Sequence, residues 1–142
     1  MVLAMAAGFT FSDVAGGESY AISGPIPARV IEVIDGDTVI VRAKIWLGQE
    51  VETRVRLAGV DTPEIKGKCE NERRLARDAR DLVRQMLGRE GEVVLSDIHY
   101  GKYAGRVVAR VDTPDGEDFS GALIRAGLGG RYDGGPRLNW CE

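Results

Sequence analysis

Signals for zinc binding and for membrane insertion are scarce in this sequence. Its 142 residues include one histidine, His99, and two cysteines, Cys69 and Cys141, with no Cys-x-x-Cys pair. A zinc site needs three or four clustered protein ligands, so these counts argue against one. No apolar run approaches the roughly 20 residues that cross a bilayer, so we expect no membrane-embedded segment. Aromatic residues make up only 6% of the chain, which disfavours an oligosaccharide-binding surface.

Neither sign of charge is in large excess. The chain has 19 Lys and Arg against 22 Asp and Glu, a net charge of −3. Any contact with a nucleic acid must therefore come from a local basic patch. The length is that of one domain, and 44% hydrophobic with 29% charged residues is typical of a soluble globular protein.

The first segment differs in composition from the rest. We expect residues 1–24 to form an N-terminal tail and residues 25–142 to form the domain. Met1–Ala7 is small and apolar and has an A-x-A-like site, but no basic segment precedes it. A remnant of a signal peptide and a disordered tail both fit this pattern.

The two cysteines lie 72 positions apart. They are either two free thiols or one long-range disulfide. By the chain-entropy relation, a bridge closing a loop of that size would stabilise the fold by roughly 4 kcal/mol. A persistent bridge would also indicate an oxidising compartment.

Hydrophobic patterning predicts a small β-barrel with helices, an α+β fold. Runs rich in β-branched residues predict strands, and apolar residues three or four apart predict a helix. The order of these elements matches a five-stranded OB-fold, a Greek-key barrel with a helix between its third and fourth strands. We expect strands at 28–34, 38–45, 51–57, 92–99 and 106–111, helices at 71–87 and 119–126, and core side chains at Val33, Ile40, Val55, Leu57, Val94, Val108, Leu75, Leu82 and Met86.

Two clusters of acidic residues carry candidate chemistry. Asp35 and Asp37 flank a glycine in a tight turn, where paired carboxylates suit a hard cation with oxygen ligands. A plain hairpin turn explains the same residues. Further along, Asp61 is placed to complete a cation site with Asp37, and Glu64 to hold or deprotonate a water. The alternative is a simple turn before Pro63.

Two arginines complete the candidate set. Arg56, on a predicted strand, suits bidentate pairing with a phosphate. Arg106 follows Tyr103 in a glycine-containing turn, an arrangement that suits a phosphate and a stacked base. Singly, each also fits an exposed strand or hairpin. Together, a cation, a base and two arginines are what phosphodiester hydrolysis needs.

These motifs resemble the staphylococcal nuclease (thermonuclease) family over about residues 26–132. They are Asp-Gly-Asp-Thr after a strand, Arg-Leu-x-x-Val-Asp-Thr-Pro-Glu, and Lys-Tyr-x-Gly-Arg before a strand. The segment Ala-Leu-Ile-Arg-Ala-Gly-Leu at 122–128 also fits. The resemblance implies an OB-fold and calcium-dependent cleavage of DNA and RNA that leaves 3′-phosphate ends. We expect a monomer that acts on single-stranded DNA and RNA and is secreted or periplasmic.

The resemblance also implies a role for each matching residue. Asp37 and Asp61 match the calcium carboxylates, Thr62 matches a backbone-carbonyl ligand, and Asp35 matches an acid just outside the ligands. Glu64 matches the general base, and Arg56 and Arg106 match the phosphate-binding arginines. Tyr103 and Tyr132 match residues of the nucleotide pocket. The alternative is a barrel of this kind that binds nucleic acid or protein without cutting. Such versions typically lose a carboxylate or an arginine, whereas this sequence keeps the whole set.

The sequence departs from the family at Ala104 and at Trp140-Cys141. Ala104 adds a residue to the common Tyr-Gly-Arg spacing, which puts the reach of Arg106 in question. Trp140-Cys141 stands where the best-known member has a C-terminal helix, and we expect Cys69 and Cys141 to form a disulfide there. Residues 65–89 hold eight Lys and Arg against four Asp and Glu. They either steer a phosphate backbone or form a solvated helix face with pairs such as Arg74–Asp78 and Arg77–Asp81.

Overall fold

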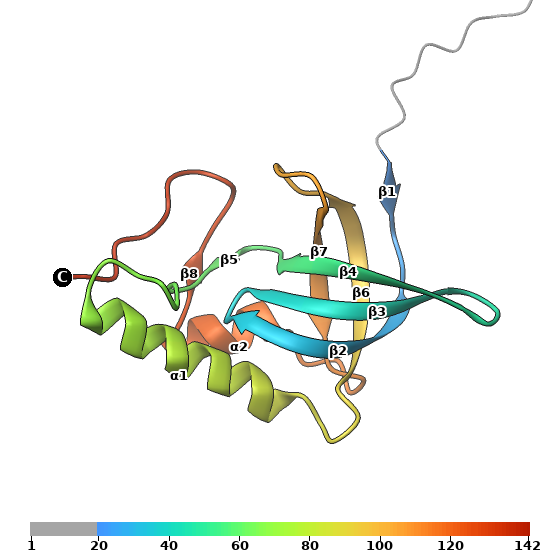
Figure 1. Cartoon of the computed structure of the whole chain (residues 1–142), viewed down its shortest axis with the longest axis horizontal. Coiled ribbons are helices and arrows are strands. Elements are labelled where there is room, and N and C mark those ends of the chain that lie inside the picture. Colours follow the sequence, from blue (N-terminus) through green and yellow to red (C-terminus); the bar gives the residue numbers. More distant parts are fainter. Residues whose placement is uncertain (1–19) are drawn as a thin grey trace, which may run out of the picture.

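Five strands close into a barrel in the computed structural model, which describes residues 20–142 (Figure 1). The strands are β2 (Ile26–Asp35), β3 (Thr38–Trp46), β4 (Gln49–Leu57), β6 (Glu92–Tyr100) and β7 (Arg106–Asp112). Strands β2, β3 and β4 form an antiparallel meander, β7 pairs in parallel with β4, and β6 pairs antiparallel with both β2 and β7. The predicted five-stranded OB-fold with helices is therefore confirmed.

Two helices pack at one end of the barrel. Helix α1 (Glu70–Met86) buries small side chains, including Ala76 and Ala79, so its backbone can lie close to β2. Helix α2 spans Phe119–Arg125, and the carboxylate of the preceding residue, Asp118, caps its first turn. Figure 1 shows the C-terminus beside the start of α1, while the β3–β4 hairpin extends from the opposite end of the barrel.

The core confirms part of the expected set and corrects the rest. Val33, Val55 and Leu57 are buried as expected. On three strands, however, the buried residues are the neighbours of the expected ones, because successive side chains on a strand point to opposite faces. Ile40, Val94 and Val108 are not in the core cluster, whereas Val39, Val41, Val93, Leu95, Ala109 and Val111 are. On α1, Leu82 and Met86 pack at the edge of the core, whereas Leu75 is not part of it.

Three short strands extend the barrel. Strand β5 (Val60–Asp61) pairs with β8 (Gly130–Arg131), which ties the segment after β4 to the C-terminal part of the chain. Strand β1 (Ala21–Ile22) pairs with β6, so ordered pairing begins inside the segment expected to be a tail, 1–24. The candidate signal-peptide remnant, Met1–Ala7, lies outside the described residues. Within 20–142, neither helix is long and apolar enough to cross a membrane.

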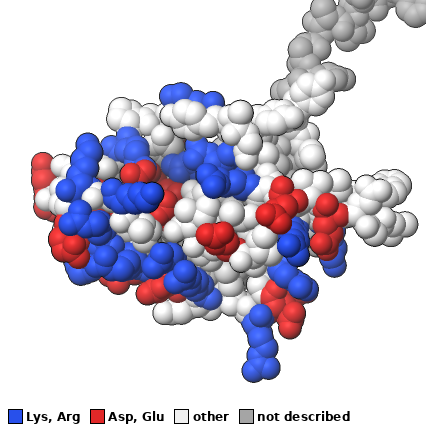
Figure 2. Space-filling model, viewed as in Figure 1, with Lys and Arg blue, Asp and Glu red and all other residues white. Residues whose placement is uncertain are grey.

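The outer face of α1 carries arginines that are mostly paired with acids. Figure 2 shows positive and negative side chains interleaved over this helix. The expected Arg74–Asp78 pair forms, whereas Arg77 contacts Glu70 in place of Asp81. This pattern is typical of a solvated helix face. The shortest nitrogen-to-oxygen distances are 3.1 Å for Arg73–Glu70, 3.0 Å for Arg77–Glu70, 3.5 Å for Arg74–Asp78 and 3.4 Å for Arg84–Asp81.

Replacing Glu70 with glutamine should lower the melting temperature slightly at neutral pH. Hydrogen bonds from Arg77 and then Arg73 lower the pKa of Glu70 below its ordinary value of 4.5. A lowered pKa stabilises the fold above the ordinary value, and the contribution is lost as the pH falls below it. The difference in melting temperature between wild type and variant should therefore shrink between pH 6 and about pH 3. A difference that stays constant over that range would contradict this assignment.

Candidate metal and phosphate site

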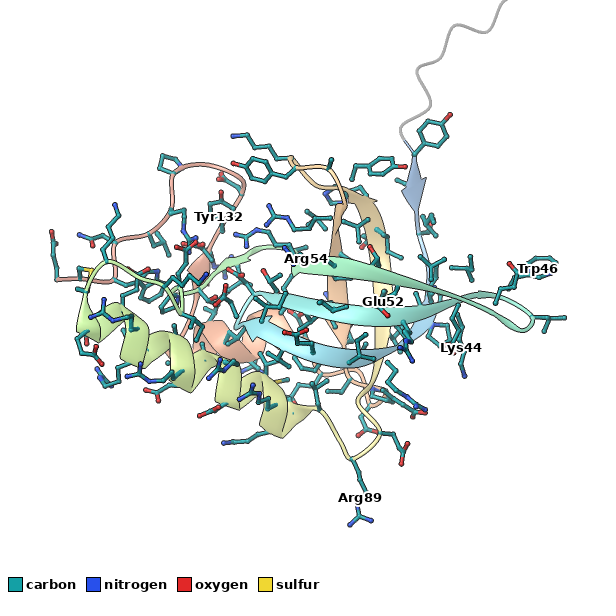
Figure 3. The ribbon with its side chains drawn as sticks, in the orientation of Figure 1. Lys44, Trp46, Glu52, Arg54, Arg89 and Tyr132 are labelled. Carbon is teal, nitrogen blue, oxygen red and sulfur yellow. A yellow bond between two sulfur atoms is a disulfide. The ribbon has the colours of Figure 1, made fainter. Side chains whose placement is uncertain are left out.

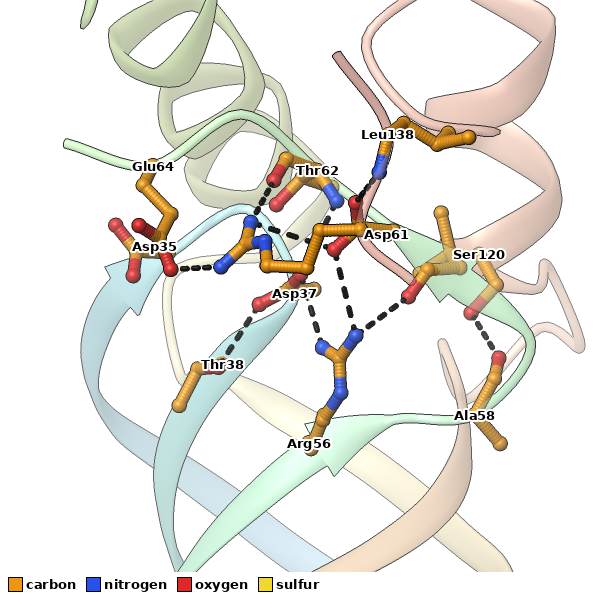
Figure 4. Close-up of polar contacts among 12 residues, drawn as sticks. Asp35, Asp37, Thr38, Arg56, Ala58, Asp61, Thr62, Glu64, Ser120 and Leu138 are labelled. Atoms are coloured by element: carbon orange, nitrogen blue, oxygen red, sulfur yellow. Dashed lines mark hydrogen bonds and ion pairs between the residues drawn. The ribbon is translucent and has the colours of Figure 1, made fainter. Parts of the chain in front are cut away.

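The β2–β3 turn and the segment after β4 interlock at one end of the barrel. Asp37 Oδ2 accepts a hydrogen bond from the Thr62 backbone N–H at 3.1 Å. Asp35 Oδ1 accepts one from the Ile65 N–H at 3.2 Å. Arg56 then pairs with Asp37 at 3.0 Å (Figure 4). The two acidic motifs, 25 residues apart in sequence, are thus joined by backbone and ionic contacts.

Gly36 allows the turn to lie against α1. A Cβ at this position would come within 2.8 Å of the Ala79 side chain and 3.2 Å of Thr62. Asp-Gly sequences often mark a positive φ, but Gly36 is not among the positive-φ glycines. The glycine is therefore needed for close packing, which fixes the acidic turn against the helix.

Asp61 is the most deeply buried acid of the site. Its side chain is 0% exposed, and its Oδ2 accepts a hydrogen bond from the Leu138 N–H at 3.0 Å. Among residues 20–142, no donor hydrogen-bonds its Oδ1, which has only longer ionic contacts with Arg56 at 3.5 Å and Arg137 at 3.3 Å. A buried carboxylate oxygen that is incompletely paired is costly without a cation.

Glu64 lies at the mouth of this cluster, on a loop shaped by a second acid. The side chain of Glu64 is 48% exposed. The buried carboxylate of Glu72 accepts hydrogen bonds from the backbone N–H groups of Glu64 and Lys68, at 3.3 and 3.0 Å. Gly67 leaves room for that carboxylate, because a Cβ there would lie 2.5 Å from it. Glu72 therefore positions the loop that carries Glu64.

The basic and aromatic residues line the same pocket, of about 340 Å³. The Arg56 guanidinium lies 4.8 Å from the Tyr132 ring centre, and that of Arg106 lies 5.2 Å from the Tyr103 ring centre. Arg106 reaches the pocket despite the extra residue at Ala104. Trp46 lies at the tip of the β3–β4 hairpin, and Figure 3 shows it far from Tyr132. This exposed tryptophan is therefore not part of the site.

Arg137 also enters the pocket, and no sequence motif marks it. Its Nη2 donates to the Thr62 carbonyl at 2.9 Å and lies 3.3 Å from Asp61 Oδ1. Its Nη1 contacts the Glu64 carboxylate. The segment that carries it is anchored near its end by the Cys69–Cys141 disulfide, whose Cα atoms are 5.8 Å apart.

One acid of the cluster, Asp35, has a raised pKa. Burial is the largest cause of the raised pKa of Asp35, and the charge of Asp37 adds to it. The hydrogen bond from Ile65 opposes both, but does not cancel them. The charges of Arg137 and Arg80 also lower the pKa of Asp35, so burial outweighs the contacts that favour its charged form.

Comparison with known proteins identifies the family. Residues 54–136, more than half of the chain, match the family model of staphylococcal nuclease homologues. Two curated relatives, each named "Uncharacterized endonuclease", come from Escherichia coli and Escherichia coli O157:H7. Each is 28% identical over 108 residues.

The aligned part includes most of the site but not all of it. Asp35, Asp37 and Arg137 lie outside the family match, and the other candidate site residues lie within it. The alignment with the relatives covers 76% of this chain but only 62% of their length. The family match and the five-stranded barrel agree, and the chain belongs to the staphylococcal nuclease homologue family.

Proposed function

We propose that this site hydrolyses phosphodiester bonds of DNA and RNA with Ca²⁺ and leaves 3′-phosphate ends. The observation that carries the proposal is the buried, incompletely paired carboxylate of Asp61, in contact with Arg56 beside a pocket lined by two tyrosines and Arg106. Family membership and the name of the relatives support a nuclease. Calcium and the 3′-phosphate products rest on the resemblance in the motifs.

The donor set fits a hard cation. Asp37 and Asp61 supply carboxylate oxygens, and Thr62 supplies a backbone carbonyl. These are oxygen ligands of the kind that Ca²⁺ prefers. Asp35 lines the same pocket and would add negative charge beside Asp37. When bound, the cation would polarise the phosphate and offset its charge.

The chain's own residues then bind and orient the substrate. Glu64, at the pocket mouth, would accept the proton of the attacking water. Arg56 and Arg106 would stabilise the charge that develops on the phosphate oxygens. Within residues 20–142, no carboxylate forms an ion pair with Arg106, and its buried Nε has no hydrogen-bond partner. Its guanidinium is therefore available for a phosphate.

The tyrosines indicate what the pocket accepts beside the phosphate. The side chain of Tyr103 is 63% exposed, and Tyr132 lines the same pocket with its ring against Arg56. Exposed rings of this kind stack on unpaired bases, so we propose single-stranded DNA and RNA as substrates. We also propose a monomer that is secreted or periplasmic, since disulfides persist in oxidising compartments.

The chemistry of the product ends tests the proposal. Single-stranded DNA and RNA carrying a 5′ label would be digested with Ca²⁺ present. The proposal predicts that phosphatase treatment changes the mobility of the fragments. It also predicts that a polymerase extends the fragments only after that treatment. Fragments that are extended directly would have 3′-hydroxyl ends and would contradict the proposal. Binding of both nucleic acids without cleavage would favour the non-catalytic barrel.

Replacing Arg106 with alanine should lower the cleavage rate by about 100-fold, the usual effect of removing one preorganised charge donor. The fold should be almost unaffected, because the side chain has no ionic partner among the described residues. Initial rates and melting temperatures would be measured together. The matched control is Arg89→Ala, since Arg89 lies far from Tyr132 in Figure 3. A rate equal to that of the control would remove Arg106 from the proposed mechanism.

A further inference from the structure

Arg137 contacts the same oxygen atoms that the proposed function assigns to the cation and the general base. Its two terminal nitrogens contact the Thr62 carbonyl, Asp61 Oδ1 and the Glu64 carboxylate. A Ca²⁺ ion would need the Thr62 carbonyl and the Asp61 carboxylate oxygen at about 2.3–2.6 Å. Because the Arg137 guanidinium is hydrogen-bonded to the Thr62 carbonyl and in ionic contact with Asp61 Oδ1, it fills that space, and the two cations compete for these ligands.

The segment around Arg137 is held against the site at three points. The next residue donates its backbone N–H to Asp61, at 3.0 Å from Leu138 N to Oδ2. The Trp140 carbonyl accepts a hydrogen bond from the Asn71 side chain at 2.9 Å, and Cys141 is bonded to Cys69. A tethered group has a high effective concentration at a nearby site. The guanidinium is thus kept close to the acids.

Arg137 is nevertheless free to leave. Its side chain is 43% exposed, whereas the Asp61 side chain that it contacts is 0% exposed. Water can therefore solvate the guanidinium once it moves away, and the anchored backbone need not move with it. The charge of the cluster also favours Ca²⁺ once Arg137 has moved away. Among residues 20–142, Arg56 is then the remaining direct ionic partner of the acids.

We propose that Arg137 is a built-in competitor for the cation, which occupies the ligand oxygens in the metal-free protein and lowers the affinity for Ca²⁺. This inference rests on the metal site of the proposed function. It assigns to Arg137 a role that neither the motifs nor the family match contains. An arginine that held the phosphate without touching the ligand oxygens would leave calcium binding almost unchanged in the absence of substrate.

Calcium titration by calorimetry, without nucleic acid and with the disulfide intact, tests the proposal. Wild type would be compared with Arg137→Ala, Arg137→Gln and the control Arg131→Ala, whose exposed side chain lies in the same segment. If the guanidinium is displaced in about a tenth of the metal-free molecules, both Arg137 variants should bind Ca²⁺ roughly tenfold more tightly. The control should match wild type. If wild type binds Ca²⁺ and the Arg137 variants bind it equally or more weakly, this inference is overturned while the proposed metal site stands.

If none of the proteins binds Ca²⁺ at millimolar concentration, the metal site of the proposed function fails and this inference fails with it. Thermal unfolding gives a second readout and shows whether the variants fold. Without Ca²⁺, both Arg137 variants should melt below wild type, because the buried Asp61 loses a partner. With saturating Ca²⁺ that deficit should shrink or reverse, since tighter binding stabilises the variants more. A deficit of the same size under both conditions would contradict competition.

Discussion

Replacing Glu64 with glutamine should lower the rate of single-stranded DNA cleavage by about 10²- to 10⁴-fold, the usual contribution of a general base. The amide keeps the shape of the side chain and can still accept a hydrogen bond from Arg137, but it cannot take a proton from water. Glu64 is half-exposed, so its loss should cost little stability. Calcium binding and nucleotide binding should remain close to those of wild type.

The matched control is Glu90→Gln, an exposed carboxylate paired only with Arg29 among the described residues. Cleavage rates would be measured at saturating Ca²⁺ and substrate, with calcium affinity determined separately. A rate like that of the control would remove Glu64 from the chemistry. A large loss of calcium affinity would instead make Glu64 a metal ligand and contradict its role as the base.

Removing the disulfide should lower the free energy of unfolding by roughly 4 kcal/mol, because the bridge closes a loop of 72 positions and restricts the unfolded chain. The double variant Cys69→Ser, Cys141→Ser should therefore unfold at a clearly lower urea concentration than the oxidised wild type. The bridge joins the start of α1 to the end of the chain, so the loss also frees the segment that carries Arg137.

Urea unfolding would be followed by circular dichroism, with and without a reductant. The reductant should destabilise wild type to about the level of the double variant and should not affect the double variant. If wild type and double variant unfold at the same midpoint in the absence of reductant, the bridge does not constrain the chain in solution.

The strands and the acidic motifs were predictable because their signals are local. Runs of β-branched residues mark each barrel strand, and Asp61, Thr62 and Glu64 are nearly adjacent in sequence. The face of a strand was harder to predict. Where three apolar residues follow one another, as in Val39–Val41, alternation does not show which of them points inward, and Ile40 was assigned to the wrong side.

Two residues of the site depend on contacts between distant segments. Arg137 is one of many arginines and is brought to Asp61 by the β5–β8 pairing and the disulfide. Glu72 looks like an ordinary acid on a helix. Its position three residues after the N-cap Cys69 was an available signal, because a glutamate there often accepts backbone N–H groups at the helix start.

The proposed function requires this acidic cluster to bind Ca²⁺ before nucleic acid is cut. The most direct test incubates the purified chain and a fluorescent single-stranded DNA with Ca²⁺, with Mg²⁺, and with Ca²⁺ plus a chelator. The proposed function predicts cleavage with Ca²⁺, none with the chelator, and recovery when Ca²⁺ is restored. Cleavage that continues unchanged in the presence of the chelator would contradict it. Binding of the DNA without cleavage when Ca²⁺ is present would contradict it too.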